Sequence, residues 1–217
     1  MEKIKVLVIG GKEKEFHDFA IMGPIFQNFL EEARFEVTLS EDLNMFLPKN
    51  IAKFDVILCY TTGQTLKPDQ EAGLLNAIIG SPWGHTGKSK GFIGVHCASC
   101  SFLNSQAYLQ MLGGKFLTHP PIGELYNFKI VNQDHPIMKE INDFSMIDEL
   151  YLLETYSPFE TLITCDFQGF IRPVAWAKPY GLGRVFYTAL GHGEEQTKNQ
   201  IFQKMIINAI SWSTQKK

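Results

Sequence analysis

Apolar runs that predict buried β-strands come shortly before three histidines of the sequence, His17, His96 and His192. If these strands are parallel neighbours, their carboxyl ends meet at one edge of the sheet and the three imidazoles converge there. An imidazole can transfer protons near neutral pH or bind a divalent metal ion. Glu149 could orient an imidazole, act as a base or complete a set of metal ligands. We therefore predict a shared site with His17, His96, Glu149 and His192 as catalytic residues, and the residue types leave open whether a divalent metal is its cofactor.

Three further residues are candidates for binding a substrate. His119 precedes Pro120 and Pro121, which restrict the backbone around it. Tyr151 and Trp176 carry aromatic faces that could pack on a sugar near the rim of the sheet. Each residue also has a structural interpretation, because a His-Pro-Pro segment can be a stiff loop and aromatic residues of predicted strands often lie in the core.

The four cysteines are best interpreted as reduced thiols, since nothing in the sequence predicts secretion. Cys97 and Cys100 form a C-x-x-C directly after a predicted strand, which is a spacing that redox dithiols use. Cys59 and Cys165 supply no second C-x-x-C for a zinc site. We favour inert thiols beside the site over a redox or zinc role.

The elements that must position these residues alternate along the first half of the chain. The run 91–95 has no polar alternation, which favours a strand covered on both faces by helices. Helices are predicted at 24–33, with Pro24 in the first position, and at 68–79, 105–112 and 201–210. The other predicted strands are 3–10, 35–40, 55–60, 128–131, 149–156, 161–166, 173–178 and 183–190. The βαβ order predicts a mostly parallel sheet with helices on both faces, and the later strands predict an appended antiparallel portion.

Composition sets the limits on partners and location. The chain has 217 residues, of which 45% are hydrophobic and 20% charged, so it can bury a three-layer α/β core, and we expect one domain over residues 1–217. A net charge of -3 without a Lys/Arg stripe argues against nucleic acid as a partner. No apolar run approaches the length of a membrane span, and the first residues lead directly into a strand. We therefore expect a cytoplasmic protein without a membrane partner, which could form a homo-oligomer.

Several motifs together resemble the ThuA-like (trehalose-utilisation) family of the class I glutamine amidotransferase-like superfamily. They are Gly91-Phe-Ile-Gly-Val-His-Cys-Ala, Leu112-Gly-Gly-Lys-Phe, His119-Pro-Pro, Asp134-His-Pro-Ile, Asp148-Glu-Leu-Tyr-Leu-Leu-Glu, Pro173-Val-Ala-Trp and Tyr180-Gly-Leu-Gly-Arg-Val-Phe-Tyr-Thr-Ala-Leu-Gly-His. The resemblance spans nearly the whole chain. It implies a flavodoxin-like three-layer sandwich and a link to disaccharide or other sugar metabolism.

The chain departs from the amidotransferases of this superfamily at the nucleophile. Their elbow looks like Gly-x-Cys-x-Gly, whereas the matching stretch here is Gly94-Val-His-Cys-Ala, so His96 stands in the place of the cysteine. Cys97 is displaced by one residue, and we expect no glutaminase activity. Two functions remain open. One is an enzyme, a hydrolase or related, that acts on a sugar or sugar derivative through acid-base or metal-assisted chemistry. The other is a noncatalytic sugar-binding or scaffolding protein.

Overall fold

The computed structural model describes residues 2–81, 89–156 and 158–214, and most of the polar loop 81–90 lies outside these ranges. Within the described residues, nine strands form one sheet in the order β2-β1-β3-β4-β11-β10-β9-β6-β7, while β5 and β8 pair separately. The strands are β1 (Lys5–Lys12), β2 (Glu36–Ser40), β3 (Val56–Thr62), β4 (Gly91–Val95), β5 (Gly114–Thr118), β6 (Leu125–Ile130), β7 (Phe144–Ile147), β8 (Leu152–Thr155), β9 (Glu160–Phe167), β10 (Phe170–Tyr180) and β11 (Gly183–Thr188).

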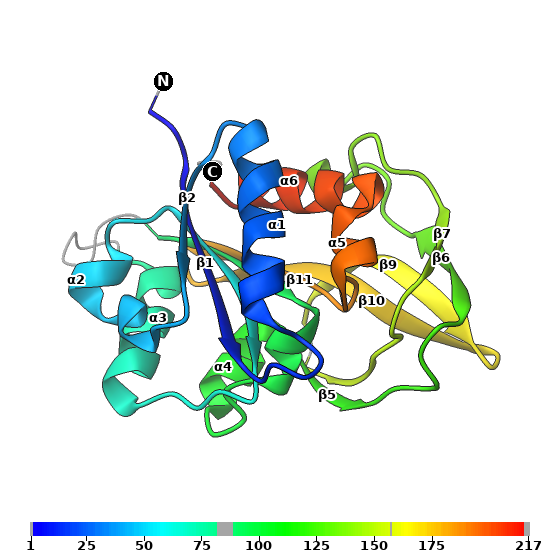
Figure 1. Cartoon of the computed structure of the whole chain (residues 1–217), viewed down its shortest axis with the longest axis horizontal. Helices are drawn as coiled ribbons and strands as arrows, with labels where there is room; N and C mark the ends of the chain where they lie inside the picture. Colours follow the sequence, from blue (N-terminus) through cyan, green and yellow to red (C-terminus); the bar gives the residue numbers. More distant parts are fainter. Residues whose placement is uncertain (1, 82–88, 157, 215–217) are drawn as a thin grey trace.

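The sheet has a parallel half and an antiparallel half. Strands β2, β1, β3, β4 and β11 are mutually parallel, so their carboxyl ends lie at the same edge. Strand β10 is antiparallel to β11, and β9, β6 and β7 continue the antiparallel order to the far edge of the sheet. In Figure 1 the long β9–β10 hairpin extends away from the helices that surround the parallel strands. The predicted mostly parallel α/β sheet with an appended antiparallel portion is confirmed.

Helices cover both faces of the parallel half (Figure 1). One face carries α1 (Phe19–Glu32), α5 (Glu194–Lys198) and α6 (Gln200–Thr214), and the other carries α2 (Pro48–Ile51), α3 (Pro68–Ile79) and α4 (Gln106–Leu112). The helices approach β4 so closely that it needs glycine on both sides. A Cβ at Gly94 would lie 2.5 Å from Leu112 of α4, and one at Gly91 would lie 2.2 Å from Ser213 of α6. This close packing explains the apolar run without polar alternation.

Helix α1 begins at Phe19 and contains Pro24, so the prediction that Pro24 is the first helical residue is wrong. The side chain of Asp18 accepts a hydrogen bond from the backbone N–H of Ala20 and caps the helix at its true start. Phe19 and Met22 are buried in the core. Capping and burial of this first turn therefore stabilise the helix by more than it loses through the hydrogen bond that Pro24 cannot donate.

Two predicted boundaries around the antiparallel half also differ from the structure. The segment between Gly113 and His119, for which no strand was predicted, forms the strand β5, which pairs antiparallel with β8. The strand predicted to begin at Glu149 begins at Leu152. Glu149 therefore lies in the connection between β7 and β8, free of strand pairing. No helix in the described ranges is long and apolar enough to span a membrane.

Candidate functional site

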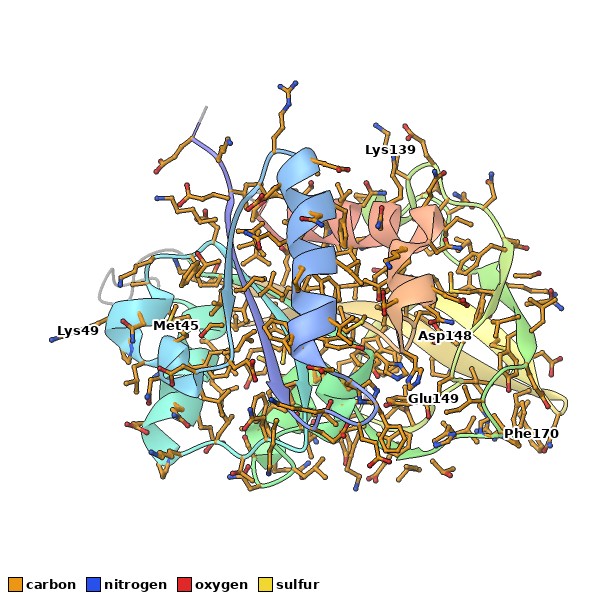
Figure 2. All side chains as sticks on the ribbon, viewed as in Figure 1. Met45, Lys49, Lys139, Asp148, Glu149 and Phe170 are labelled. Carbon is orange, nitrogen blue, oxygen red and sulfur yellow. The ribbon has the colours of Figure 1, made fainter. Side chains whose placement is uncertain are left out.

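His17, His96, Glu149 and His192 converge at the carboxyl edge of the parallel strands. Each offers one ligand atom, and these four atoms all lie within 4.8 Å of one another. The ring centroids of the three histidines are 5.1–5.2 Å apart. Figure 2 shows Glu149 below α5, at the end of the sheet toward which the β1 arrow points in Figure 1. The predicted placement of the three histidines in one site is confirmed, whereas their roles remain predictions.

His96 occupies a sharp turn between β4 and the 3-10 helix η2 (His96–Cys100). Its φ of +43° lies in the left-handed region, which a residue with a Cβ adopts only when its surroundings hold it there. Its carbonyl oxygen accepts hydrogen bonds from the hydroxyls of Tyr187 and Ser99 at 3.0 and 3.1 Å. The strained elbow is thus present, and it carries a fully buried imidazole in place of a nucleophile.

The hydrogen bonds of His96 define its chemical state. Its Nδ1 lies 2.6 Å from the carbonyl oxygen of Ala189, which can only accept, so Nδ1 carries a proton. Its Nε2 lies 3.0 Å from Glu149 Oε2 and 3.3 Å from His192 Nδ1. In a neutral ring the Nε2 lone pair would face a carboxylate oxygen, and this contact is repulsive. A cation, either a proton or a metal ion, therefore belongs between these atoms.

His192 follows β11 and faces the same carboxylate. Its Nδ1 lies 2.8 Å from Glu149 Oε2. This hydrogen bond raises the pKa of His192, and the partial burial of the ring opposes the rise. The backbone of His192 is also fixed, because its carbonyl oxygen accepts the hydroxyl hydrogen of Tyr60 at 2.7 Å.

His17 comes from the loop between β1 and α1, and it is neutral at neutral pH. Burial, followed by the charges of His96 and His192, lowers its pKa to about 3. Its Nδ1 lies 3.2 Å from Thr62 Oγ1 at the end of β3. Its Nε2 is the one buried side-chain nitrogen or oxygen without a hydrogen-bond partner among the described residues. An unpaired buried ring nitrogen is costly, and in the tautomer with the proton on Nδ1 a metal ion at the cluster would satisfy it.

Glu149 links the inner histidines to the surface. Burial would raise the pKa of Glu149, but hydrogen bonds from His192 and His96 outweigh burial and lower it, so the carboxylate is ionised. Its second oxygen, Oε1, lies 3.1 Å from His119 Nε2. The exposed fractions of the side chains rise from 6% for Glu149 to 19% for His192 and 37% for His119. The cluster is therefore open to solvent on the side of His119 and His192.

The two aromatic residues predicted to contact a substrate are buried. Tyr151 packs against His96 with a centroid distance of 3.9 Å and forms a wall of the site rather than an open surface. Trp176 is fully buried, stacks on Phe159 at 4.6 Å and donates its indole N–H to the carbonyl oxygen of Leu112. We therefore drop Trp176 from the substrate contacts, because its ring and its one polar atom are already used in the core.

The cysteines are free thiols within the described ranges. Cys97 is fully buried, and burial raises its pKa well above the usual range. Burial also raises the pKa of Cys100 to about 11, and its thiol donates to the hydroxyl of Tyr151 at 3.6 Å. Neither side chain is a thiolate at neutral pH, which agrees with the interpretation as inert thiols.

Sequence reasoning missed two residues that hold the site together. Thr62 contacts His17 from the carboxyl end of β3, and the rule that found the histidines at strand ends could have found it. Asp148 accepts backbone N–H groups of Glu149, Gly191 and His192. Asp148 begins one of the motifs that resemble the family, but its role could not be predicted, because two of these partners lie more than 40 residues away.

Solved structures share this fold over nearly its whole length. A ThuA-like protein from Parabacteroides merdae has a TM-score of 0.83 at 16% identity, and the match covers 98% of this chain and 90% of that one. A cytoplasmic protein from Salmonella typhimurium LT2 has a TM-score of 0.70 at 11% identity, with 98% and 100% covered. A β-galactosidase from Bacillus circulans sp. alkalophilus has a TM-score of 0.65 at 13% identity, and the match covers 98% of this chain but 31% of the enzyme.

At such identities these likenesses show the fold alone. No curated protein matches the sequence. The family is shown by a sequence model instead, because the model of ThuA, described as trehalose utilisation, matches residues 5–213. That description points to a role in sugar metabolism. The chain belongs to the ThuA family.

Proposed function

We propose that this protein is an enzyme of sugar metabolism that acts on a disaccharide or sugar derivative at the cluster of His17, His96, Glu149 and His192, with a divalent metal as cofactor. The observation that carries the proposal is the unpaired, buried Nε2 of His17, a residue that belongs to the same cluster as His96, Glu149 and His192. The family description supports a sugar as substrate. We expect the protein to work in the cytoplasm on a small molecule, without nucleic acid or membrane.

The donor set fits a metal such as Zn²⁺. Three imidazoles and one carboxylate are ligands that zinc accepts. The contacts among His96, His192 and Glu149 are 2.8–3.3 Å, and with His17 included all four ligand atoms lie within 4.8 Å, so the four residues could hold one ion. A bound divalent ion would supply Lewis acidity toward a sugar oxygen and would lower the pKa of bound water.

The side chains of the chain itself provide proton transfer. Glu149 is ionised and can accept a proton from a substrate hydroxyl at the open side of the cluster. His119 contacts the other carboxylate oxygen and is the most exposed member, so it can exchange protons between Glu149 and solvent. Its Nδ1 donates to the carbonyl oxygen of Pro120 at 2.8 Å, which leaves Nε2 for that exchange.

Glutamine hydrolysis is not part of this proposal. The elbow presents the imidazole of His96, and the neighbouring thiol of Cys97 is buried with a raised pKa. Neither group can attack a carbonyl carbon as a cysteine thiolate would. Glutamine turnover that is abolished by Cys97→Ser would contradict this expectation.

The proposal is tested by metal content and by turnover. We expect purified protein to bind Zn²⁺ or a similar ion, and a screen of disaccharides and their oxidised derivatives with added divalent metals to reveal a substrate. His96→Ala and His192→Ala should each lower turnover by roughly 10²-fold or more. The matched control is His135→Ala, whose imidazole accepts a backbone N–H outside the cluster. Equal turnover in wild type and both cluster variants would reject the assigned roles.

One observation favours the noncatalytic alternative, which is a sugar-binding or scaffolding protein. Most of the cluster is closed to solvent, since His17, His96 and Glu149 are all buried. A sugar could then contact only His119 and His192 at the rim. Binding of a sugar without turnover anywhere in the screen would support this alternative.

A further inference from the structure

The carboxylate of Asp148 connects two segments that carry site residues. It follows β7, is 1% exposed, and lies beside Glu149 in Figure 2. Its Oδ1 accepts the backbone N–H of Glu149 at 2.8 Å and that of His192 at 3.2 Å. Its Oδ2 accepts the N–H of Gly191 at 2.8 Å. One buried side chain thus binds the connection that bears Glu149 and the turn that bears His192.

Glycine is required for the second half of this arrangement. Gly191 has a φ of +100°, and a Cβ there would lie 2.7 Å from the ring of Phe202. Consecutive N–H groups around such a left-handed residue can point at one anion. The conformation of Gly191 therefore directs its own N–H and that of His192 toward Asp148.

A charge this deeply buried requires compensation, and Asp148 has no salt bridge to lysine or arginine within the described ranges. Burial of an ionised carboxylate is costly unless hydrogen bonds replace its water. Three backbone donors supply this replacement here. A neutral apolar side chain could fill the same space but could not accept these hydrogen bonds. The carboxylate therefore joins the two segments in a way that an apolar side chain could not.

We propose that Asp148 is the positioning residue of the site: it sets the spacing between Glu149 and His192 by fixing their backbones to each other. The expected effect on metal binding rests on the proposed function. The hydrogen bonds by which Asp148 holds the two backbone segments together do not depend on that function. Asp148 touches neither metal nor substrate in this assignment. Its effect reaches the site through the 2.8 Å contact of Glu149 Oε2 with His192 Nδ1.

The test is Asp148→Asn, which keeps the shape of the side chain. The retained oxygen can still accept two N–H groups, but the new amide group faces the N–H of Gly191 as a second donor. In the metal-free protein we expect faster hydrogen exchange at the amides of Gly191 and His192. We also expect Zn²⁺ affinity, measured by competition with a chelator, to fall about 10–100-fold, and the d–d absorption spectrum of bound Co²⁺ to change.

Two control variants separate this role from general destabilisation. Asp143→Asn alters a carboxylate that accepts one backbone N–H, from Ile130, in the same half of the protein. Gln196→Ala removes another hydrogen bond between α5 and the end of β7, in which the Gln196 side chain donates to the carbonyl oxygen of Ile147 at 2.7 Å. Both should leave the Co²⁺ spectrum and the two amides unchanged.

The outcomes are decisive with or without a metal. Unchanged amide exchange and unchanged Zn²⁺ affinity in Asp148→Asn would overturn the inference, as would equal losses in the two controls. If wild type binds neither Zn²⁺ nor Co²⁺, the proposed metal chemistry fails, and amide exchange still decides the role of Asp148. If Asp148→Asn does not fold, the wild type suffices, because rapid exchange at both Gly191 and His192 would show that the carboxylate does not hold them.

Discussion

The parallel and antiparallel halves of the sheet contribute to the site in different ways. His17, His96 and His192 follow the parallel strands β1, β4 and β11, whose carboxyl ends meet because of strand order alone. Glu149 and His119 come from the β7–β8 and β5–β6 connections, which join the antiparallel half to the separate β5–β8 pair, and the position of these connections depends on long-range contacts. The parallel half therefore supplies the buried nitrogen ligands. The connections of the antiparallel half supply the negative charge and, together with His192, the access to solvent.

The largest expected effect comes from removing that charge. Glu149→Gln keeps the size of the side chain but loses the carboxylate, so it should lower turnover about 10²–10⁴-fold. It should also lower the pKa of His192, because the hydrogen bond and the charge of Glu149 are what raise it. Turnover assays and an NMR titration of the imidazole would measure the two effects.

The control for this comparison is Glu154→Gln in β8. Glu154 lies in the β5–β8 pair, in the strand that follows Glu149, and forms a surface ion pair with Lys115 at 2.9 Å. Such pairs contribute little, so turnover should stay close to that of wild type. A loss in Glu154→Gln as large as that in Glu149→Gln would show that the antiparallel half acts through its stability and not through the carboxylate.

The same division explains what could be predicted from the sequence. His96 and His192 were found because the end of a buried parallel strand has a known location in the fold. The placement of Trp176 was wrong because an apolar strand in an antiparallel extension gives no sign of whether a ring faces a rim or the core. Asp148 was missed because its partners Gly191 and His192 are brought to it by the fold and not by spacing.

Packing should differ between the halves as well. Gly94→Ala in β4 places a Cβ 2.5 Å from Leu112, and overpacking of a core covered on both faces should cost about 1–3 kcal/mol. Gly169→Ala, at the tip of the β9–β10 hairpin, meets nothing within 4 Å and has only its φ of +80° to oppose it, which costs about 1–2 kcal/mol. Urea unfolding would measure the loss in the free energy of unfolding for both variants. A larger loss in Gly169→Ala would contradict the assignment of the tighter packing to the parallel half.

The pH dependence of stability should show opposite signs for two histidines of the parallel half. The folded-state pKa of His17 is lowered to about 3, so between pH 6.5 and 3 the unfolded chain binds a proton that the folded chain does not. Stability should therefore fall as pH falls, by up to about 1.4 kcal/mol per pH unit. The pKa of His192 is raised, so its stabilisation is complete below the unfolded-state pKa and is lost as pH rises through the raised value.

Urea unfolding of metal-free protein between pH 7 and pH 4 would measure this dependence. His17→Gln should reduce the fall in the free energy of unfolding at acid pH, because glutamine has no proton to gain in the unfolded chain. Curves of wild type and His17→Gln that remain parallel throughout this range would mean that His17 takes up its proton at the same pH in the folded and the unfolded chain. The lowered pKa of His17 would then be contradicted.

The smallest effect on metal binding should come from replacing His119, the most exposed residue that contacts Glu149. Its contact with Glu149 is partly exposed, and partly exposed polar contacts are worth about 0.2–1 kcal/mol, so His119→Gln should weaken Zn²⁺ binding less than about 5-fold. Turnover should fall more than affinity, because glutamine cannot carry a proton between Glu149 and solvent. Added imidazole buffer should restore part of this turnover by taking over the transfer. If imidazole has no effect while affinity drops as far as in Glu149→Gln, His119 holds the carboxylate in place instead of exchanging its proton.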